Sequence, residues 1–182
     1  RDARSRHDRL LKPPAAPETT QSKSPESSKD AGKPVLSNRY RLARLIGQGG
    51  SGVVHEALDL VLNRTVAVKL LSESIGDNLS QIEDFLREAR TAAILNHPNI
   101  VTIHDTGQSG SKYFIVMEYV DGESLKSHLE TRLNLSLSDL LDLAKQACVG
   151  LDYAHRKGIL HRDIKPGNLL VDREGIVKIT DF

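Results

Sequence analysis

A short segment late in the chain gathers side chains that could carry out acid–base and metal chemistry. Between His161 and Asn168 the sequence reads His-Arg-Asp-Ile-Lys-Pro-Gly-Asn, which places a carboxylate, an ammonium group and a carboxamide close together. A positioned carboxylate such as Asp163 can accept or orient the proton of a hydroxyl group. The side-chain oxygens of Asn168 and of Asp181, further along the chain, are of the hard kind that Mg²⁺ prefers. These residues are candidates for a base and for metal ligands.

The glycines between residues 47 and 54 form a second feature of chemical interest. The segment reads Gly-Gln-Gly-Gly-Ser-Gly-Val-Val, and the missing side chains allow backbone N–H groups to approach phosphate oxygens closely. The pattern by itself also suits a plain hairpin or a dinucleotide-binding loop. A strand is predicted to follow where a dinucleotide site needs a helix, and the Gly-Lys-Ser/Thr of a P-loop is missing. The surrounding sequence must therefore decide whether these glycines form a phosphate-binding loop or a plain hairpin.

A lysine in an apolar strand is the third feature. In Val66-Ala67-Val68-Lys69, strand alternation places Ala67 and Lys69 on one face. A solvated strand lysine is the plain interpretation, but Glu88 lies on the apolar side of the helix predicted next and can supply a counter-charge. Lys69 could then hold phosphate oxygens while Glu88 fixes its orientation.

Residues 1–36 differ in composition from the rest. They contain five of the seven prolines, many Ser, Lys and Thr residues and no aromatic residue. Such a segment buries too little apolar surface to offset the entropy of ordering, so it is predicted to be a disordered tail. It could act as a regulatory arm phosphorylated at Ser24, which precedes a proline, but a passive linker is the favoured interpretation.

The remaining sequence predicts strands first and helices later. A hairpin is expected around the glycines, with strands at 65–71, 100–105 and 113–120. A capping box at 80–83 opens an amphipathic helix that His97-Pro98 ends. Further helices are predicted at 124–132 and 138–157, the second capped by Gly158, and a small hairpin at 169–171 and 176–179.

In this order, the glycine loop, Val-Ala-Val-Lys, the His-Arg-Asp segment and Asp181-Phe182 resemble protein kinases over about residues 38–182. The string Ile164-Lys165-Pro166 resembles the serine/threonine version. The segments Phe85-Leu-Arg-Glu-Ala, 97–101 and 117–122 are most similar to bacterial eukaryotic-like kinases. The sequence stops within the family's Asp-Phe-Gly motif.

The resemblance implies an α+β fold of two lobes. Residues 37–120 would form a complete β-rich N-lobe with one αC-type helix and the hinge, and residues 121–182 a partial, truncated helical C-lobe. It also implies that Asp163 is the base, that Lys165 steadies the γ-phosphate, that Lys69 and Glu88 form the phosphate-binding pair, and that Asn168 and Asp181 bind magnesium.

The implied cofactors are ATP and Mg²⁺. Adenine would lie between Ile46, Val54 and Ala67 above and Leu170 below, with Met117 at the back. Backbone groups of Glu118 and Val120 would bind the base, and Glu123 or Ser124 the ribose. The nucleotide-binding set is Ile46, Gly47, Gln48, Gly49, Gly50, Ser51, Gly52, Val54, Ala67, Lys69, Met117, Glu118, Val120 and Leu170.

The implied activity is transfer of the γ-phosphoryl group of Mg·ATP to Ser or Thr hydroxyls of proteins, with a dimer for autophosphorylation as a further expectation. A nucleotide-binding pseudokinase or partner-binding module is the alternative, although every visible catalytic position is intact. Both ends of the sequence look like cuts, and we expect this stretch alone to be inactive. A membrane anchor could lie outside it.

Composition excludes other classes of protein. A formal net charge of +1 gives no field that would attract nucleic acid, and no apolar run suits a membrane span. The lone Cys148 favours a reducing, cytoplasmic setting, and it is predicted to be a small core residue. His97 and His104 are expected to be structural or surface residues, and His161 to pack against Phe182.

Overall fold

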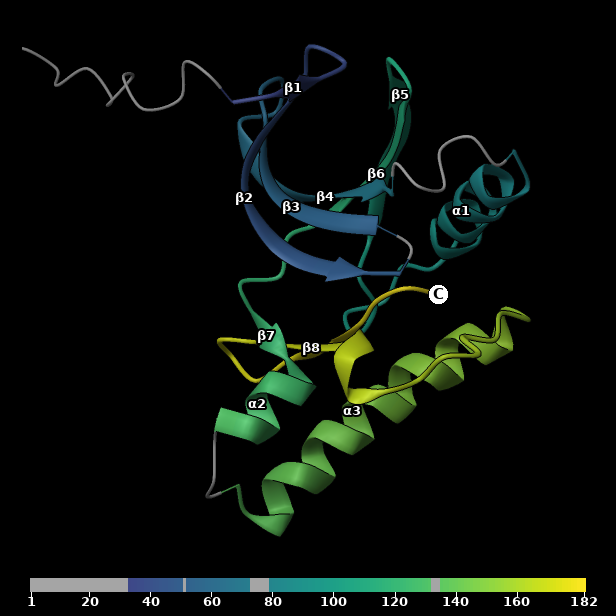
Figure 1. Ribbon diagram of the computed structural model, residues 1–182. Coiled ribbons are helices and arrows are strands. Elements are labelled where there is room, and N and C mark those ends of the chain that lie inside the picture. The colour runs from purple at the N-terminus through teal and green to yellow at the C-terminus, as the bar shows by residue number, and fades with distance from the viewer. Residues whose placement is uncertain (1–32, 51, 73–78, 132–134) are drawn as a thin grey trace, which may run out of the picture. The chain divides into compact units, whose positions relative to one another are not determined.

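The computed structural model describes residues 33–50, 52–72, 79–131 and 135–182. An antiparallel six-stranded sheet occupies the first half (Figure 1), with the strand order β1-β2-β3-β4-β6-β5. The strands are β1 (Val35–Leu36), β2 (Tyr40–Gly49), β3 (Gly52–Asp59), β4 (Arg64–Leu71), β5 (Ile103–Ser109) and β6 (Lys112–Glu118).

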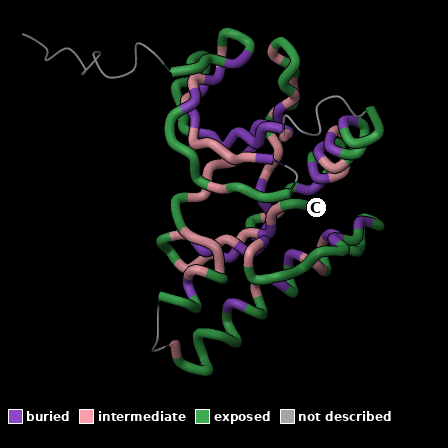
Figure 2. Tube along the Cα trace, in the orientation of Figure 1, coloured by how far each residue is buried: buried purple, intermediate pink, exposed green. Residues whose placement is uncertain are grey.

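The two faces of β4 serve two different cores, because side chains alternate along a strand. Val66, Val68 and Leu70 belong to a cluster with Tyr40 and Phe114. Ala67 and Leu71 belong to a second cluster, which includes Ile115 and Met117 and packs against helix α1 (Leu79–Ala92). Lys69 falls on this second face, as the alternation predicted, and it is 4% exposed. Figure 2 shows the buried positions along the middle of the sheet and on α1.

Helix α1 is amphipathic, as predicted, with Ile82, Phe85, Ala89 and Ala92 buried. The predicted capping box is wrong, because the helix already includes Leu79 and Ser80 therefore lies in its first turn. A strand at 100–105 is also displaced, and β5 instead covers 103–109. Ile100 and Val101 pair with a different partner: Val101 N–H donates to Ile179 O over 2.9 Å.

Strand β1 contains residues that the sequence analysis assigned to the tail. Val35 and Leu36 pair with Arg41 and Tyr40, and Leu36 is 5% exposed within the first core. Pro34 O also accepts a hydrogen bond from Leu42 N–H. The folded part of the chain therefore extends into the predicted tail, of which residues 1–32 lie outside the described residues.

The second half contains a small antiparallel sheet and two helices. Its elements are β7 (Gly122–Ser124), α2 (Leu125–Thr131), α3 (Leu137–Arg156), the 3₁₀ turn η1 (Pro166–Asn168), β8 (Leu169–Asp172) and β9 (Val177–Ile179). The predicted hairpin corresponds to β8 and β9. Strand β7, which the sequence analysis missed, pairs with β8 so closely that a Cβ on Gly122 would lie 2.0 Å from Val171 O.

Helix α3 lies against β9 through one stripe of residues. Leu143, Ala147, Gly150 and Ala154 are buried, and a Cβ on Gly150 would come within 2.9 Å of Ile179 Cδ1. The helix ends at Arg156, and Gly158 follows with φ +76°, a conformation that suits glycine. The prediction for Cys148 is wrong: its side chain is exposed, because one residue beyond Ala147 turns it about 100° away from the stripe.

Candidate active site

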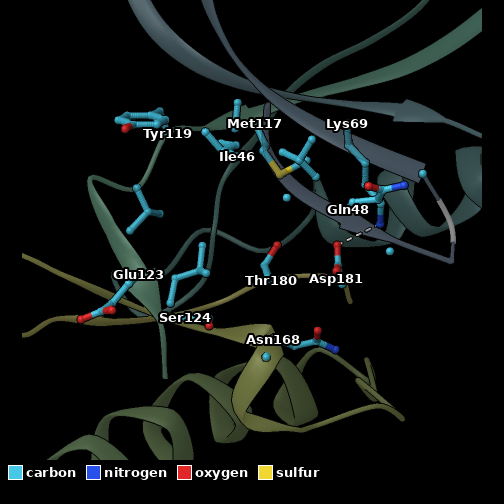
Figure 3. A pocket seen from close by; sticks show the side chains of 18 of the residues that line it. Ile46, Gln48, Lys69, Met117, Tyr119, Glu123, Ser124, Asn168, Thr180 and Asp181 are labelled. Atoms are coloured by element: carbon cyan, nitrogen blue, oxygen red, sulfur yellow. Dashed lines mark hydrogen bonds and ion pairs between the residues drawn. The ribbon is translucent and has the colours of Figure 1, made fainter. Parts of the chain in front are cut away.

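A cavity of about 1050 Å³ lies between the glycine-bearing strands and the small sheet (Figure 3). This volume lies just above the usual range of about 300–1,000 Å³ for ligand and cofactor sites. Every predicted site residue that the structure describes lines it; Ser51 lies outside the described residues. The apolar part of the lining includes Ile46, Val54, Ala67, Met117, Val120 and Leu170. A planar aromatic base therefore has an apolar slot to enter.

The glycines of the loop differ in what they do. Gly52 has φ +149°, and a Cβ there would lie 1.9 Å from Leu70 O, so the fold itself requires glycine. Gly49 and Gly50 have no such reason: a Cβ on either would meet no described atom within 4 Å. The absence of side chains at Gly49 and Gly50 leaves room at the cavity for a ligand. Backbone N–H groups that no side chain shields can also bind phosphate oxygens.

Lys69 is the buried cation of the cavity. Its Nζ lies 3.2 Å from Glu88 Oε1 on α1 and 2.9 Å from Asp181 Oδ1, which reaches toward it in Figure 3. Burial by itself lowers the pKa of Lys69, but the nearby carboxylates of Asp181 and Glu88 outweigh burial and raise it above its ordinary value. The ammonium group therefore stays charged and held at the cavity wall.

Asp163 lies in a loop that several hydrogen bonds fix. Lys165 Nζ donates to its Oδ2 over 2.7 Å, and this bond, more than any other contact, lowers the pKa of Asp163 below its ordinary value. Asn168 Nδ2 donates to Asp163 O and to its Oδ2, over 2.9 and 3.2 Å. The preceding Arg162 has φ +64°, an uncommon conformation for a residue other than glycine. Asp163 therefore remains ionised and able to accept a proton.

His161 supports the loop that carries Asp163 through hydrogen bonds. Its Nδ1 accepts a hydrogen bond from Asp163 N–H over 3.3 Å, and its Nε2 donates to Thr180 O over 2.8 Å. The ring also lies against Phe182, with the ring centroids 4.7 Å apart, which confirms the predicted packing. His161 thereby ties the Asp163 loop to the segment that carries Asp181.

The two residues predicted to bind magnesium offer an amide oxygen and a carboxylate. Because Nδ2 of Asn168 is engaged with Asp163, its oxygen Oδ1 is the atom left for a metal. Asp181 is 40% exposed and lines the same cavity. Among the described residues no three His, Cys, Asp or Glu side chains cluster as a metal site. The residues therefore suit a hard cation that takes its other ligands from phosphate and water.

Residues predicted to contact the base and the ribose already make hydrogen bonds within the protein. Glu118 N–H already donates to Thr102 O over 2.9 Å, so its carbonyl is the backbone group left for a base. The Ser124 hydroxyl accepts from Ser127 N–H and donates to Ser127 Oγ, as an N-cap of α2 does. Glu123 also lines the cavity, and His128 Nδ1 lies 3.0 Å from its Oε1.

Sequence reasoning missed several residues that line the cavity. Arg44 lies at its mouth, bound to Glu56 over 2.7 Å and to the Tyr119 hydroxyl over 3.0 Å. No motif marked Arg44, because its place depends on strand pairing between β2 and β3. Thr180 also lines the cavity, and its position next to Asp181 could have indicated this.

No helix in the described part of the chain is long and apolar enough to cross a membrane.

Comparisons with known proteins agree with this geometry. The family model described as "Protein kinase domain" matches residues 40–182. The serine/threonine-protein kinase PknA of Mycobacterium tuberculosis is 49% identical over 153 residues, which are 81% of this chain and 36% of the relative. PrkC of Bacillus subtilis is 42% identical over 147 residues, 81% of this chain and 23% of the relative.

A crystal structure of the M. tuberculosis PknI kinase domain superposes with a TM-score of 0.70 at 30% identity, over 83% of this chain and 61% of that chain. The predicted fold, a β-rich N-lobe with a partial C-lobe, is confirmed. The chain spans about a third of the length of the PknA relative. It belongs to the protein kinase domain family, among relatives that are bacterial serine/threonine kinases.

Proposed function

We propose that the protein is a transferase, a serine/threonine protein kinase that moves the γ-phosphoryl group of Mg·ATP to hydroxyl groups of protein substrates. The observation that supports this best is the buried Lys69 between Glu88 and Asp181, in the same cavity as Asp163. Phosphoryl transfer needs positioning and preorganised charge more than covalent chemistry by the protein. This cavity offers both.

Each residue has a part in this proposal. Asp163 accepts the proton of the substrate hydroxyl, and Lys165 stabilises charge on the group in transit. Lys69 holds phosphate oxygens and Glu88 keeps it in place.

Asn168 and Asp181 hold Mg²⁺, which neutralises phosphate charge when bound. The base enters the apolar slot, with the Glu118 carbonyl and Val120 N–H as its partners, and Glu123 binds the ribose.

Further parts of the assignment are proposals of the same kind. The N-lobe and hinge, predicted at 37–120, also include strand β1 (Val35–Leu36), and residues 121–182 act as the beginning of the C-lobe. The kinase domain works in the cytoplasm, where ATP is available, and pairs with a second copy for autophosphorylation. The bare Gly49 and Gly50 and the complete set of catalytic side chains favour catalysis over the pseudokinase alternative.

The test is phosphate transfer by the whole protein from Mg·[γ-³²P]ATP to a generic basic protein. Asp163→Asn should lower the rate by about 10² or more at unchanged thermal stability, in the range found for loss of a general base. Asp152→Asn, an exposed change on α3, is the matched control and should leave the rate unchanged. An equal rate for parent and Asp163→Asn would refute the proposal.

A further inference from the structure

A half-buried ion pair crosses from the hinge to the small sheet. Lys178 Nζ lies 2.8 Å from Glu118 Oε1, with side chains 16% and 28% exposed. The second oxygen, Oε2, accepts Thr102 N–H over 3.2 Å. Three elements therefore hold the carboxylate of Glu118: its own strand β6, the segment before β5, and β9.

The two partners differ in how they relate to the cavity: Glu118 lines it, whereas Lys178 does not line it but shortly precedes Asp181 in the chain. Glu118 is the last residue of β6 and lines the cavity where a base would bind. Lys178 lies in the middle of β9, directly opposite Leu170 of the apolar slot. The chain then runs from Lys178 through Thr180 to Asp181, the residue that faces Lys69.

The path from Lys178 to Asp181 is tightly fixed. Ile179 N–H donates to Asn99 O, Ile179 O accepts Val101 N–H, and Thr180 N–H donates to Asn168 O, all within 3.0 Å. A shift of β9 at Lys178 would therefore be transmitted to Asp181 and Asn168 rather than absorbed in a loose loop. Both residues are the metal ligands of the proposed function.

We propose that the Glu118–Lys178 ion pair couples the base-binding end of the cavity to its metal-binding end. This inference rests on the proposed function. Glu118 and Lys178 act here as positioning residues: the pair keeps the base-binding edge of β6 and the Asp181 segment in register, so that magnesium strengthens ATP binding fully only when both are in place. Removing one partner leaves the other charge half-buried and unpaired, which favours movement of the strand that carries it.

The chain provides a matched control for this pair. Arg173 Nε lies 3.1 Å from Asp121 Oδ2, and this pair also links the segment after Glu118 to the β8–β9 hairpin. Its side chains are 80% and 56% exposed, and Arg173 lies in the turn before β9 rather than between the cavity and Asp181. Exposed pairs contribute little, so its loss should leave the coupling unchanged.

The experiment measures ATP affinity of the whole protein by titration calorimetry, once with Mg²⁺ and once with EDTA. The ratio of the two affinities is the gain due to magnesium. Lys178→Met should reduce this gain by about 5-fold or more, the lower end of measured coupling between sites, while affinity in EDTA changes by less than about 2-fold. Lys178→Arg should restore the gain, and Arg173→Met should keep it.

A double-mutant cycle identifies the pair as the cause. Glu118→Gln, which keeps size and shape, should reduce the gain as Lys178→Met does, and the double variant should lose no more than either one. If Lys178→Met fails to fold, the single variant Glu118→Gln still tests whether the ion pair is needed for the gain due to magnesium.

A parent protein without Mg·ATP binding would refute the proposed function. A parent that binds, with the gain retained in Lys178→Met and Glu118→Gln, would refute this inference alone. Equal weakening with and without Mg²⁺ would show a merely structural role and also overturn it.

Discussion

At the scale of single residues, the site works through charges whose environments the fold sets in advance. Lys69 is buried but keeps its proton because two carboxylates lie within 3.2 Å of its ammonium group. Asp163 is exposed and keeps its charge because Lys165 binds it. A buried donor and an accessible acceptor therefore face one cavity.

Lys69→Met should cut turnover by about 10² or more, because a preorganised positive charge at the phosphate is lost. ATP affinity should fall much less, since the apolar slot and the glycines remain. Steady-state phosphate transfer and calorimetric ATP binding on the whole protein would measure both. Lys126→Met, on the exposed side of α2, is the control; turnover equal to that of the parent in Lys69→Met would contradict this role.

A second residue-scale prediction concerns Asp59, whose side chain is fully buried at the end of β3. Arg39 donates to both of its oxygens over 3.0 and 2.8 Å, and Val61 and Leu62 N–H groups donate to Oδ1. The Arg39 hydrogen bonds are the main cause that lowers the pKa of Asp59 to about 2.

Because this pKa is depressed in the folded state, the stabilisation is present above the unfolded value of about 3.9 and is lost as pH falls toward 2. Asp59→Asn should lower the free energy of unfolding by roughly 2 kcal/mol at pH 7, and the difference from the parent should shrink below pH 4. Urea unfolding from pH 2 to 7 would show it. Asp152→Asn is the exposed control, and a pH-independent difference would contradict the argument.

At the scale of elements, the sequence predicted long, strongly patterned segments well and short or shared ones poorly. The 14 residues of α1 and the hairpin β8–β9 follow from periodicity and turn residues. The three residues of β7 and the two of β1 are too short to show a pattern, and they exist because a neighbouring strand offers backbone partners. Tertiary pairing likewise explains the strand predicted at 100–105. The strand in the structure is β5 (Ile103–Ser109), because Ile100 forms a β-bridge with Ile179 instead.

The candidate site was predictable for a related reason. The motifs marked in advance most of the charged and polar residues that line the cavity, because the acid–base, metal and phosphate roles proposed for them restrict residue types. Arg44 and the His128 support of Glu123 were not predictable, since any polar side chain brought there by strand or helix packing could line the cavity.

Two glycines of the β2–β3 hairpin allow stability and ATP binding to be tested separately. Gly52→Ala forces a Cβ to within 1.9 Å of Leu70 O, so it should lower the unfolding free energy by several kcal/mol or prevent folding. Gly50→Ala meets no described atom within 4 Å and should change stability by less than about 0.5 kcal/mol.

ATP affinity should nevertheless fall in Gly50→Ala, because its methyl group would occupy ligand space. Thermal unfolding and calorimetry on both variants would measure this. Unchanged ATP affinity in Gly50→Ala would contradict a phosphate role for the loop, and normal stability in Gly52→Ala would contradict the close approach to Leu70.

At the scale of the whole molecule, the boundary of the folded unit is set by packing rather than by composition. Residues 33–182 form one compact unit, and its first core residue is Leu36. The proline-rich composition that marked the tail continues to Pro34, although Pro34 O already accepts a hydrogen bond from the sheet.

Deleting residues 1–32 should therefore leave the free energy of unfolding within about 0.5 kcal/mol of the parent value. Deleting residues 1–36 removes Leu36 from the core and should cost at least about 2 kcal/mol, as for other large core truncations. Urea unfolding of the two truncated proteins compares them directly. Equal stability of both would mean that β1 contributes nothing, and a loss already at residue 32 would mean that the preceding segment packs on the unit.

The outward position of Cys148 on α3 has a practical consequence. It is the single cysteine of the chain, and its thiol is exposed although Ala147, the residue before it, is buried. A maleimide dye or spin label can therefore be attached there with no other thiol in these 182 residues, and Cys148 does not line the cavity. A second label introduced at exposed Val61, in the β3–β4 turn, would make the distance between the N-lobe and α3 measurable while nucleotide and magnesium are added.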